Sequence, residues 1–190
     1  MSKTYISNKS WYIYDKLSID LQLNTDDFNS FYNSKPDKKH NIFIYGKHVE
    51  QPRYSQSYGK DYNYSNTISK SLPFTTFLSK YLEFANILDN NFNMALVNWY
   101  ENGYNYIGWH SDNEKLIKKN TSILSITFGA ERDFQIREKI NHKNKINLKL
   151  ENNSYLIMGG EFQNEFQHQL PKRLKCKDKR INITFREFIK

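Results

Sequence analysis

Two histidines and one aspartate have the residue types and the spacing to bind a metal ion. His110 and Asp112 stand two residues apart in the segment GWHSDNE, and His168 lies in the later segment FQHQLPK. In an extended strand, residues two apart point to the same side, so the first two side chains can reach one point. Two histidines and a carboxylate form the ligand set of non-haem Fe(II) oxygenases. The His-x-Asp pair alone is also compatible with a polar pair on a surface loop.

A segment near the C-terminus, RINITFR, has polar and apolar residues in strict alternation. The residues of its two faces are Arg180, Asn182, Thr184 and Arg186 against Ile181, Ile183 and Phe185. Two arginines that face the inside of a β-barrel are costly unless an anion neutralises them. A dicarboxylate could do so, because a guanidinium pairs bidentately with a carboxylate. An edge strand with a solvated polar face is the alternative interpretation.

The segment before the metal motif, NMALVNWY, repeats this alternation. Its two faces consist of Met94, Leu96, Asn98 and Tyr100 against Ala95, Val97 and Trp99. We therefore expect Asn98 and Tyr100 to donate hydrogen bonds into the same cavity as the arginines. Two other histidines fit a metal site less well. His40 and His142 lie in lysine-rich segments, where we expect them to be solvated.

The elements that position these residues can be predicted from periodicity. Residues 25–33 are expected to form a short helix with Asn24 or Thr25 as its cap. A second helix is predicted to open at Ser71, because the apolar residues from Phe74 to Leu88 follow the spacing of one buried face. From Asn93 onward the period becomes two, and short apolar or alternating segments are separated by Gly, Asn and Lys turns. This pattern predicts a mainly β fold with flanking helices, such as a jelly roll.

Length and composition limit the kind of protein. The chain has 190 residues, which is the size of one domain. We expect a single domain over 1–190, with an N-terminal extension and lid over about 1–70 and a catalytic core over about 93–188. Cys176 is the only cysteine, so the sequence allows neither an internal disulfide nor a cysteine-based metal site.

Charge and hydropathy suggest a compartment and a partner. Lys and Arg outnumber Asp and Glu by 28 to 20, which gives a formal net charge of +8. Such a charge suggests a polyanionic partner such as nucleic acid, or merely a lysine-rich surface. The sequence has no apolar stretch of membrane-spanning length and no signal-peptide core at its N-terminus. We therefore expect an intracellular, soluble monomer in the cytoplasm or nucleus that binds no membrane.

Several motifs in a fixed order resemble one known family. They are NWYENG, WHSDNE, SITFGAERDF, FQHQLPK and RINITFR. Together they resemble the AlkB-type 2-oxoglutarate- and Fe(II)-dependent dioxygenases, and the eukaryotic-type nucleic-acid demethylases within that family most of all. The similarity extends from about Ile42 to Glu187. It implies a double-stranded β-helix (a cupin-like jelly roll) with an N-terminal nucleotide-recognition lid, and it implies 2-oxoglutarate and dioxygen as cosubstrates of the iron.

The resemblance also implies residues for the iron and the cosubstrate. The implied iron ligands are His110, Asp112 and His168. The residues implied at the distal carboxylate of 2-oxoglutarate are Arg180, Tyr100 and Asn182, and those near its iron-chelating end are Asn98 and Arg186. In such enzymes 2-oxoglutarate is oxidatively decarboxylated to succinate and carbon dioxide, while an N-methyl group on a base is hydroxylated and leaves as formaldehyde.

The tyrosine-rich segment QPRYSQSYGKDYNYS resembles the lid of these demethylases. A base must leave its stack to reach a metal inside a barrel, and aromatic faces can hold it there. By the resemblance, Tyr64, with Tyr62 beside it, would stack on the flipped base, and Arg53 would contact the nucleotide. Glu114 would face the methylated base. Tyr45 falls where DNA-repair relatives carry an apolar finger that fills the gap left by the base, and it could stack there or simply pack the lid.

Two basic segments follow the metal motif, over residues 137–145 and 171–180. Either could flank the mouth of the barrel and hold phosphates without reading sequence, or could be an ordinary solvated loop. The first is shorter than in relatives that bind duplex DNA, which leaves single-stranded DNA or RNA open. The prediction is an oxidative demethylase that repairs N-alkylated bases of the 1-methyladenine and 3-methylcytosine type in DNA and possibly RNA. The alternatives are a hydroxylase of a protein or small molecule, and a nucleic-acid-binding module without turnover.

Overall fold

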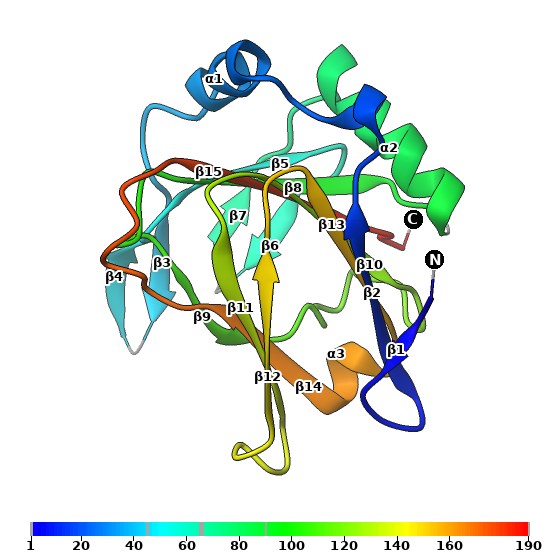
Figure 1. The fold of residues 1–190 in the computed structure, drawn as a ribbon. Helices are drawn as coiled ribbons and strands as arrows, with labels where there is room; N and C mark the ends of the chain where they lie inside the picture. The colour runs from blue at the N-terminus through cyan, green and yellow to red at the C-terminus, as the bar shows by residue number, and fades with distance from the viewer. Residues whose placement is uncertain (1, 45, 65–66, 90, 190) are drawn as a thin grey trace.

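Two antiparallel β-sheets form the body of the molecule (Figure 1). The computed structural model describes residues 2–44, 46–64, 67–89 and 91–189. The strands of the larger sheet, in spatial order, are β1 (Thr4–Tyr5), β2 (Ser10–Lys16), β13 (Ser154–Gly160), β10 (Ile123–Gly129), β15 (Arg180–Arg186), β8 (Met94–Tyr100) and β5 (Tyr54–Tyr58). The strands of the smaller sheet are β12 (Lys145–Leu150), β11 (Arg132–Glu138), β14 (Phe166–Leu170) and β9 (Ile107–His110).

This arrangement confirms the predicted mainly β, jelly-roll fold. The six segments in which a period of two was recognised all form strands, which are β8, β10, β11, β12, β13 and β15. The N-terminal strand β2, which pairs with β13 along its whole length, was not anticipated. Its residues from Trp11 to Tyr14 are half-buried on both faces of the sheet. A strand without a buried and an exposed face lacks the alternation on which the prediction depends.

Two helices lie on the outer side of the larger sheet. Helix α1 (Thr25–Asn33) has the predicted bounds, and the side chain of Asn24 caps it by accepting from the backbone N–H of Asp27. Helix α2 (Thr76–Leu88) begins at Thr76, capped by Thr75, so the prediction that it opens at Ser71 was wrong. Leu72 instead exchanges backbone hydrogen bonds with Ser57 and Gly59 beside the end of β5. Those bonds hold residue 72 in an extended conformation.

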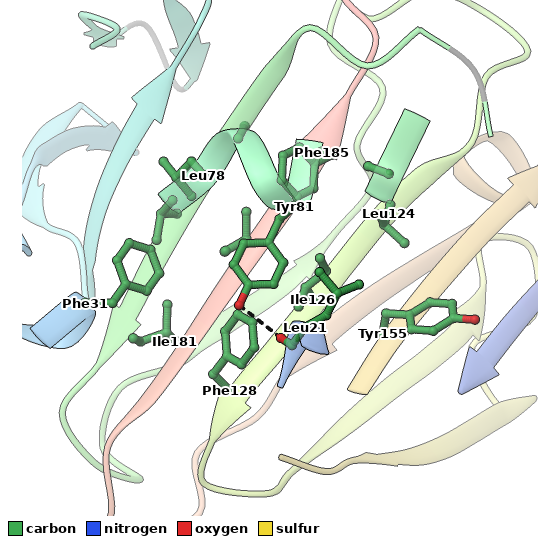
Figure 2. Packing of buried hydrophobic residues seen from close by; sticks show 14 of the residues in the cluster. Leu21, Phe31, Leu78, Tyr81, Leu124, Ile126, Phe128, Tyr155, Ile181 and Phe185 are labelled. Carbon is green, nitrogen blue, oxygen red and sulfur yellow. Dashed lines mark hydrogen bonds between the residues drawn. The ribbon is translucent and has the colours of Figure 1, made fainter. Parts of the chain in front are cut away.

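The largest hydrophobic cluster joins these helices to the sheet (Figure 2). Phe31 of α1 and Leu78, Tyr81 and Ala85 of α2 pack on the apolar faces of β8, β10, β13 and β15. The hydroxyl of Tyr81 donates to the carbonyl oxygen of Leu21 in the short 3-10 helix η1 (Ile19–Leu21). The predicted apolar face of the second helix is therefore confirmed as core.

A second hydrophobic cluster fills part of the space between the two sheets. The buried members of this cluster are Ile123, Phe134, Ile136, Leu150, Leu156, Met158, Phe162 and Phe166. Helix α3 (Phe162–Glu165) connects β13 to β14. Two hairpins, β3 (Asn41–Ile44) with β4 (Lys47–Glu50) and β6 (Tyr62–Tyr64) with β7 (Thr67–Ser69), come before and after β5 along the chain. Within the described ranges, no helix combines the length and apolar character that a membrane span requires.

Candidate active site

The three predicted metal ligands come together on the smaller sheet. His110 ends β9 and lies opposite His168 of β14 in the strand register. Asp112 follows two residues later, and its Oδ1 is 3.8 Å from Nε2 of His110. One potential ligand atom from each of the three side chains lies within 4.8 Å of the other two. The two imidazole rings are 4.3 Å apart between centroids. The sequence therefore predicted correctly that these residues are close neighbours.

The protonation states of these side chains suit a metal ion. Burial lowers the pKa of His168 to about 3, and burial also lowers the pKa of His110, so both imidazoles are neutral at pH 7. Burial opposes ionisation of Asp112, but Arg186 outweighs it, so the pKa of Asp112 lies below its ordinary value. Nδ1 of His168 is buried and has no hydrogen-bond partner among the described residues. Two neutral imidazoles and one carboxylate are a donor set that fits Fe(II).

Arg186 forms an ion pair with Asp112. Its Nη2 lies 2.9 Å from Oδ1 of Asp112, and both side chains are almost fully buried. The sequence predicted two inward arginines that a bound anion must neutralise. The chain itself neutralises one of them, because Asp112 carries the compensating charge.

Arg180 has no such partner. Its guanidinium is 1% exposed and donates to Thr127 Oγ1 at 2.8 Å and to the carbonyl oxygens of Ala130 and Leu150. Among the described residues, no carboxylate lies within 4.0 Å of it, and its Nε has no hydrogen-bond partner. Burial lowers the pKa of Arg180 to about 10, so it remains a cation at neutral pH. A buried cation of this kind fits a carboxylate supplied by a ligand.

The other residues predicted for the cosubstrate line the same cavity. Tyr100, Asn98 and Asn182 share it with both arginines and the metal triad. The amide of Asn182 is already occupied, because Nδ2 donates to Ser125 Oγ and to the carbonyl oxygen of Ile126. This geometry gives Asn182 a direct function in fastening β15 to β10 beside the cavity.

Arg53 reaches deeper than expected. It is 6% exposed, and its Nε donates to Oδ1 of Asn98 at 2.8 Å. Arg53 precedes β5 and was predicted as a nucleotide contact; the structure brings it to the cavity wall next to a predicted cosubstrate residue. His40 also lines the cavity, with its Nε2 buried, so the expectation that it is solvated was wrong. The lysine-rich composition of the segment before β3 did not reveal that His40 lies at the cavity wall.

Tyr62 and Glu114 form one pair at this cavity. The phenol of Tyr62 donates to Oε1 of Glu114 at 2.5 Å, and Arg186 lies 5.3 Å from the centre of the Tyr62 ring. Burial, followed by the charge of Asp112, raises the pKa of Glu114. Tyr62 lines the cavity, and its hydrogen bond to Glu114 holds that carboxylate beside the cavity wall. The side chain of Tyr64 and the whole of Tyr45 lie outside the described residues, so their predicted contacts stay predictions.

Sequence reasoning missed several polar residues at this site, and three of them hold predicted site residues in place. Ser125 and Thr127 of β10 hold Asn182 and Arg180, and Gln163 of α3 accepts a hydrogen bond from the backbone N–H of Asp112. The alternation of ILSITFG, with both hydroxyl residues on one face, could have revealed the first two. Gln163 lies in the short helix α3, and its contact joins residues 51 positions apart. No sequence pattern signals such a contact.

Comparison with known proteins agrees with this fold and site. Residues 16–186 match the family model described as the 2OG-Fe(II) oxygenase superfamily. The chain therefore belongs to that superfamily, and membership implies Fe(II) as the metal with 2-oxoglutarate and dioxygen as cosubstrates. The predicted resemblance to AlkB-type enzymes is confirmed by the relatives that the chain matches.

One of these relatives is named as a DNA oxidative demethylase, and another as an alpha-ketoglutarate-dependent dioxygenase. The chain is 32% identical over 119 residues to the DNA oxidative demethylase ALKBH2 of Arabidopsis thaliana, over 51% of this chain and 38% of that protein. It is 34% identical over 105 residues to the alpha-ketoglutarate-dependent dioxygenase alkB homolog 3 of Bos taurus, over 51% of this chain and 37% of that protein. The matched part thus spans less than half the length of either relative.

A solved structure shares the fold of the whole chain. The structure of OsALKBH1 superposes with a TM-score of 0.64 and covers 98% of this chain and 100% of its own. Its sequence identity is 14%, so the similarity concerns the fold alone.

Proposed function

We propose that this protein is an oxidative demethylase that removes N-methyl groups from alkylated bases, of the 1-methyladenine and 3-methylcytosine type, in DNA and possibly RNA. The observation that carries the proposal is one cavity that holds both the His110, Asp112 and His168 cluster and a buried arginine without a counter-ion. A dicarboxylate cosubstrate would supply the missing negative charge. The names of the matched relatives, among them a DNA oxidative demethylase, support a nucleic-acid substrate.

Each residue of the cavity has a proposed task. The three clustered side chains would hold Fe(II), and Arg180 with Tyr100 would bind the distal carboxylate of 2-oxoglutarate. Fe(II), held there with 2-oxoglutarate and dioxygen, would supply the oxidising chemistry for hydroxylation of the N-methyl group, which would then leave as formaldehyde. Asn98, whose carbonyl oxygen is fixed by Arg53, would orient the iron-chelating end of the cosubstrate.

Arg186 has a different task from Arg180. Its ion pair with Asp112 would keep that carboxylate ionised and fixed in position. The same guanidinium lies against the ring of Tyr62 and would thereby also position this side chain on the substrate side of the cavity. Asn182 would support the cosubstrate site from behind, because its amide is bonded to β10.

The segment from Asn41 to Ser69 would act as the lid over the base. Tyr62 forms part of the cavity wall, and the hydrogen bond from its hydroxyl fixes the carboxylate of Glu114. We propose that this carboxylate faces the methylated base. Tyr64 would stack on the flipped base and Arg53 would contact the nucleotide from the cavity wall. Tyr45 would lie in the gap that the base leaves.

Basic and aromatic side chains outside the cavity suit a nucleic-acid strand. The guanidinium of Arg137 lies 4.2 Å from the centre of the Trp109 ring, directly beside His110. Lys172 lies 4.9 Å from the ring of Tyr106, which precedes the cavity residue Ile107. Cations and exposed rings together bind phosphates and bases without sequence preference.

A panel of methylated oligonucleotides tests this proposal. Single- and double-stranded DNA and RNA carrying one methylated base would be incubated with the protein, Fe(II), 2-oxoglutarate and ascorbate, and the product mass measured. We expect a loss of one methyl group and formation of succinate. Succinate without demethylation of any oligonucleotide would refute the nucleic-acid substrate and favour a hydroxylase of a protein or small molecule. Binding without succinate, unchanged in a His110→Ala and Asp112→Ala double variant, would indicate a binding module without turnover.

A further inference from the structure

The backbone of Asp112 is held by side chains rather than by the sheet. β9 ends at His110, and its pairing with β14 is irregular between His168 and Leu170. Asp112 lies two residues beyond that end. There its N–H donates to Oε1 of Gln163 at 2.9 Å. The preceding Ser111 donates through Oγ to the carbonyl oxygen of Phe166 at 2.7 Å.

Gln163 is itself fixed from two sides. Its backbone carbonyl oxygen accepts from Nζ of Lys139 at 2.8 Å, and its side-chain Nε2 lies 3.8 Å from the sulfur of Met158. The side chain is half-buried, between β13 and the turn that carries Asp112. Lys139 thus holds the backbone of Gln163, and Met158 contacts its side-chain amide. That amide accepts from the N–H of Asp112 and can therefore set the direction in which the carboxylate of Asp112 leaves the backbone.

The N-terminal hairpin anchors the helix that carries Gln163. Glu165, the last residue of α3, accepts hydrogen bonds from the hydroxyls of Ser7 and Ser10, each at 2.5 Å. The backbone N–H of Glu161 donates to the carbonyl oxygen of Lys9, at the other end of α3. Both ends of this four-residue helix are therefore bonded to the connection between β1 and β2 and to the start of β2.

We infer that Gln163 is a positioning residue for the metal ligand Asp112, and that the N-terminal hairpin supports it through Glu165. Residues that orient metal ligands change metal affinity by about 10- to 100-fold when they are replaced. The inference concerns the metal site and does not depend on which substrate the enzyme accepts. It assigns to β1 and β2 a supporting function at the metal ligand Asp112, which lies more than 90 residues later in the sequence.

Binding of Mn(II) to the metal-free protein tests this inference. Gln163→Leu keeps the size of the side chain but removes the acceptor, and should weaken Mn(II) binding by about tenfold or more in titration calorimetry. Gln163→Glu keeps an acceptor oxygen and should stay within about threefold of the wild type. Asn164→Ala, on the exposed side of the same helix, is the matched control and should bind as the wild type does.

Two further measurements separate positioning from general damage. Thermal unfolding of the metal-free variants should show Gln163→Leu folded, and the amide of Asp112 should exchange faster in it than in Asn164→Ala. Ser7→Ala combined with Ser10→Ala should weaken Mn(II) binding by a smaller factor. Wild-type affinity in Gln163→Leu, or equal losses in Gln163→Leu and Gln163→Glu, would overturn the inference. Because no substrate is present, a failure here is distinct from a failure of the demethylase proposal.

Discussion

Arg180 and Arg186 share one face of β15 but differ in how their charges are balanced. Arg186 pairs with Asp112 at 2.9 Å, whereas Arg180 is surrounded by neutral oxygens of Thr127, Ala130 and Leu150. A buried ion pair serves the structure, but a buried cation without a counter-ion is costly until a ligand neutralises it. At the scale of single residues, Arg180 therefore marks the cosubstrate end of the cavity.

Replacing Arg180 by Met should weaken cosubstrate binding at least about 30-fold without unfolding the protein. Removal of one partner of a buried charge pair costs about 2 to 5 kcal/mol, roughly 30-fold to several thousand-fold in affinity. Calorimetry with 2-oxoglutarate on the Mn(II)-loaded protein measures this loss. The thermal unfolding midpoint of the ligand-free variant should not fall, because an unbalanced buried charge has been removed.

Arg173→Met is the matched control for this prediction. Its guanidinium is 41% exposed, and it contacts Glu131 near the surface. This variant should bind 2-oxoglutarate as the wild type does. If Arg180→Met also binds within about threefold of the wild type, Arg180 is not the partner of the distal carboxylate.

The sequence revealed which residues face the cavity but not how they pair. The alternation in β8 and β15 predicted correctly that Asn98, Tyr100, Arg180 and Arg186 line one space. It could not show that Arg186 is neutralised by Asp112. Such partnerships depend on how strands from different sheets approach one another, and a period of two carries no information about that approach.

At the scale of elements, the start of helix α2 shows how tertiary contacts set a boundary. The apolar spacing predicted the buried face, but the cap at Thr75 and the bonds of Leu72 to the chain at β5 decide where the helix begins. The spacing of apolar residues continues into the preceding turn, so periodicity alone places the start several residues too early. Capping residues define helix ends more sharply than apolar spacing does.

Thr75→Ala should lower the free energy of unfolding by about 1 kcal/mol, because the N–H of Leu78 loses its side-chain acceptor. Urea denaturation of the metal-free protein measures this change. The neighbouring Thr76→Ala is the control, since Thr76 is also exposed but does not cap the helix. Equal losses in the two variants would contradict the assignment of Thr75 as the cap.

The β6–β7 hairpin is fastened by one carboxylate. Asp61 accepts from Nζ of Lys70 and from the backbone N–H and hydroxyl of Ser71. The bond from Lys70, followed by those from Ser71, lowers the pKa of Asp61 to about 2. Because the pKa is depressed in the folded state, the stabilisation is present above about pH 4 and is lost as the pH falls towards 2.

Asp61→Asn should therefore reduce protection of the Ser71 amide from hydrogen exchange at pH 5 and above. Protection factors from nuclear magnetic resonance, corrected for the intrinsic exchange rate, would be compared for the two proteins. The difference should shrink as the pH falls from about 4 to 2, when the wild-type carboxyl becomes protonated. A difference that stays constant over this range would contradict the role assigned to the ionised carboxylate.

At the scale of the whole molecule, the positive charge is carried partly by segments beside the cavity. Residues 137–145 span the end of β11, the connection to β12 and the first residue of β12, and residues 171–179 join β14 to β15. Charge composition predicted a polyanionic partner, but it could not show that cations of these segments lie against Trp109 and Tyr106 next to the cavity strand β9. Such stacking is determined by the fold, since it joins Arg137 of β11 to Trp109 of β9, and Lys172 of the β14–β15 connection to Tyr106.

Removing three of these charges should make single-strand binding less dependent on salt. Each phosphate contact on a single strand contributes about 0.7 to the slope of log affinity against log salt. A variant with Lys143, Lys145 and Lys172 changed to Gln should lose roughly 2 from this slope, measured by fluorescence anisotropy. The control changes Lys9, Lys16 and Lys80, which are exposed on the N-terminal hairpin and α2, to Gln. An equal loss of slope in both variants would show that net charge alone accounts for binding.

The central claim is that one cavity couples 2-oxoglutarate turnover to removal of a methyl group from nucleic acid. The most direct measurement is the amount of formaldehyde and succinate formed from a single-stranded oligonucleotide with one 1-methyladenine. We predict equal amounts of the two products, and neither product from Asp112→Ala. Succinate formed without formaldehyde, or no succinate at all from the Fe(II)-loaded wild type, would contradict the account.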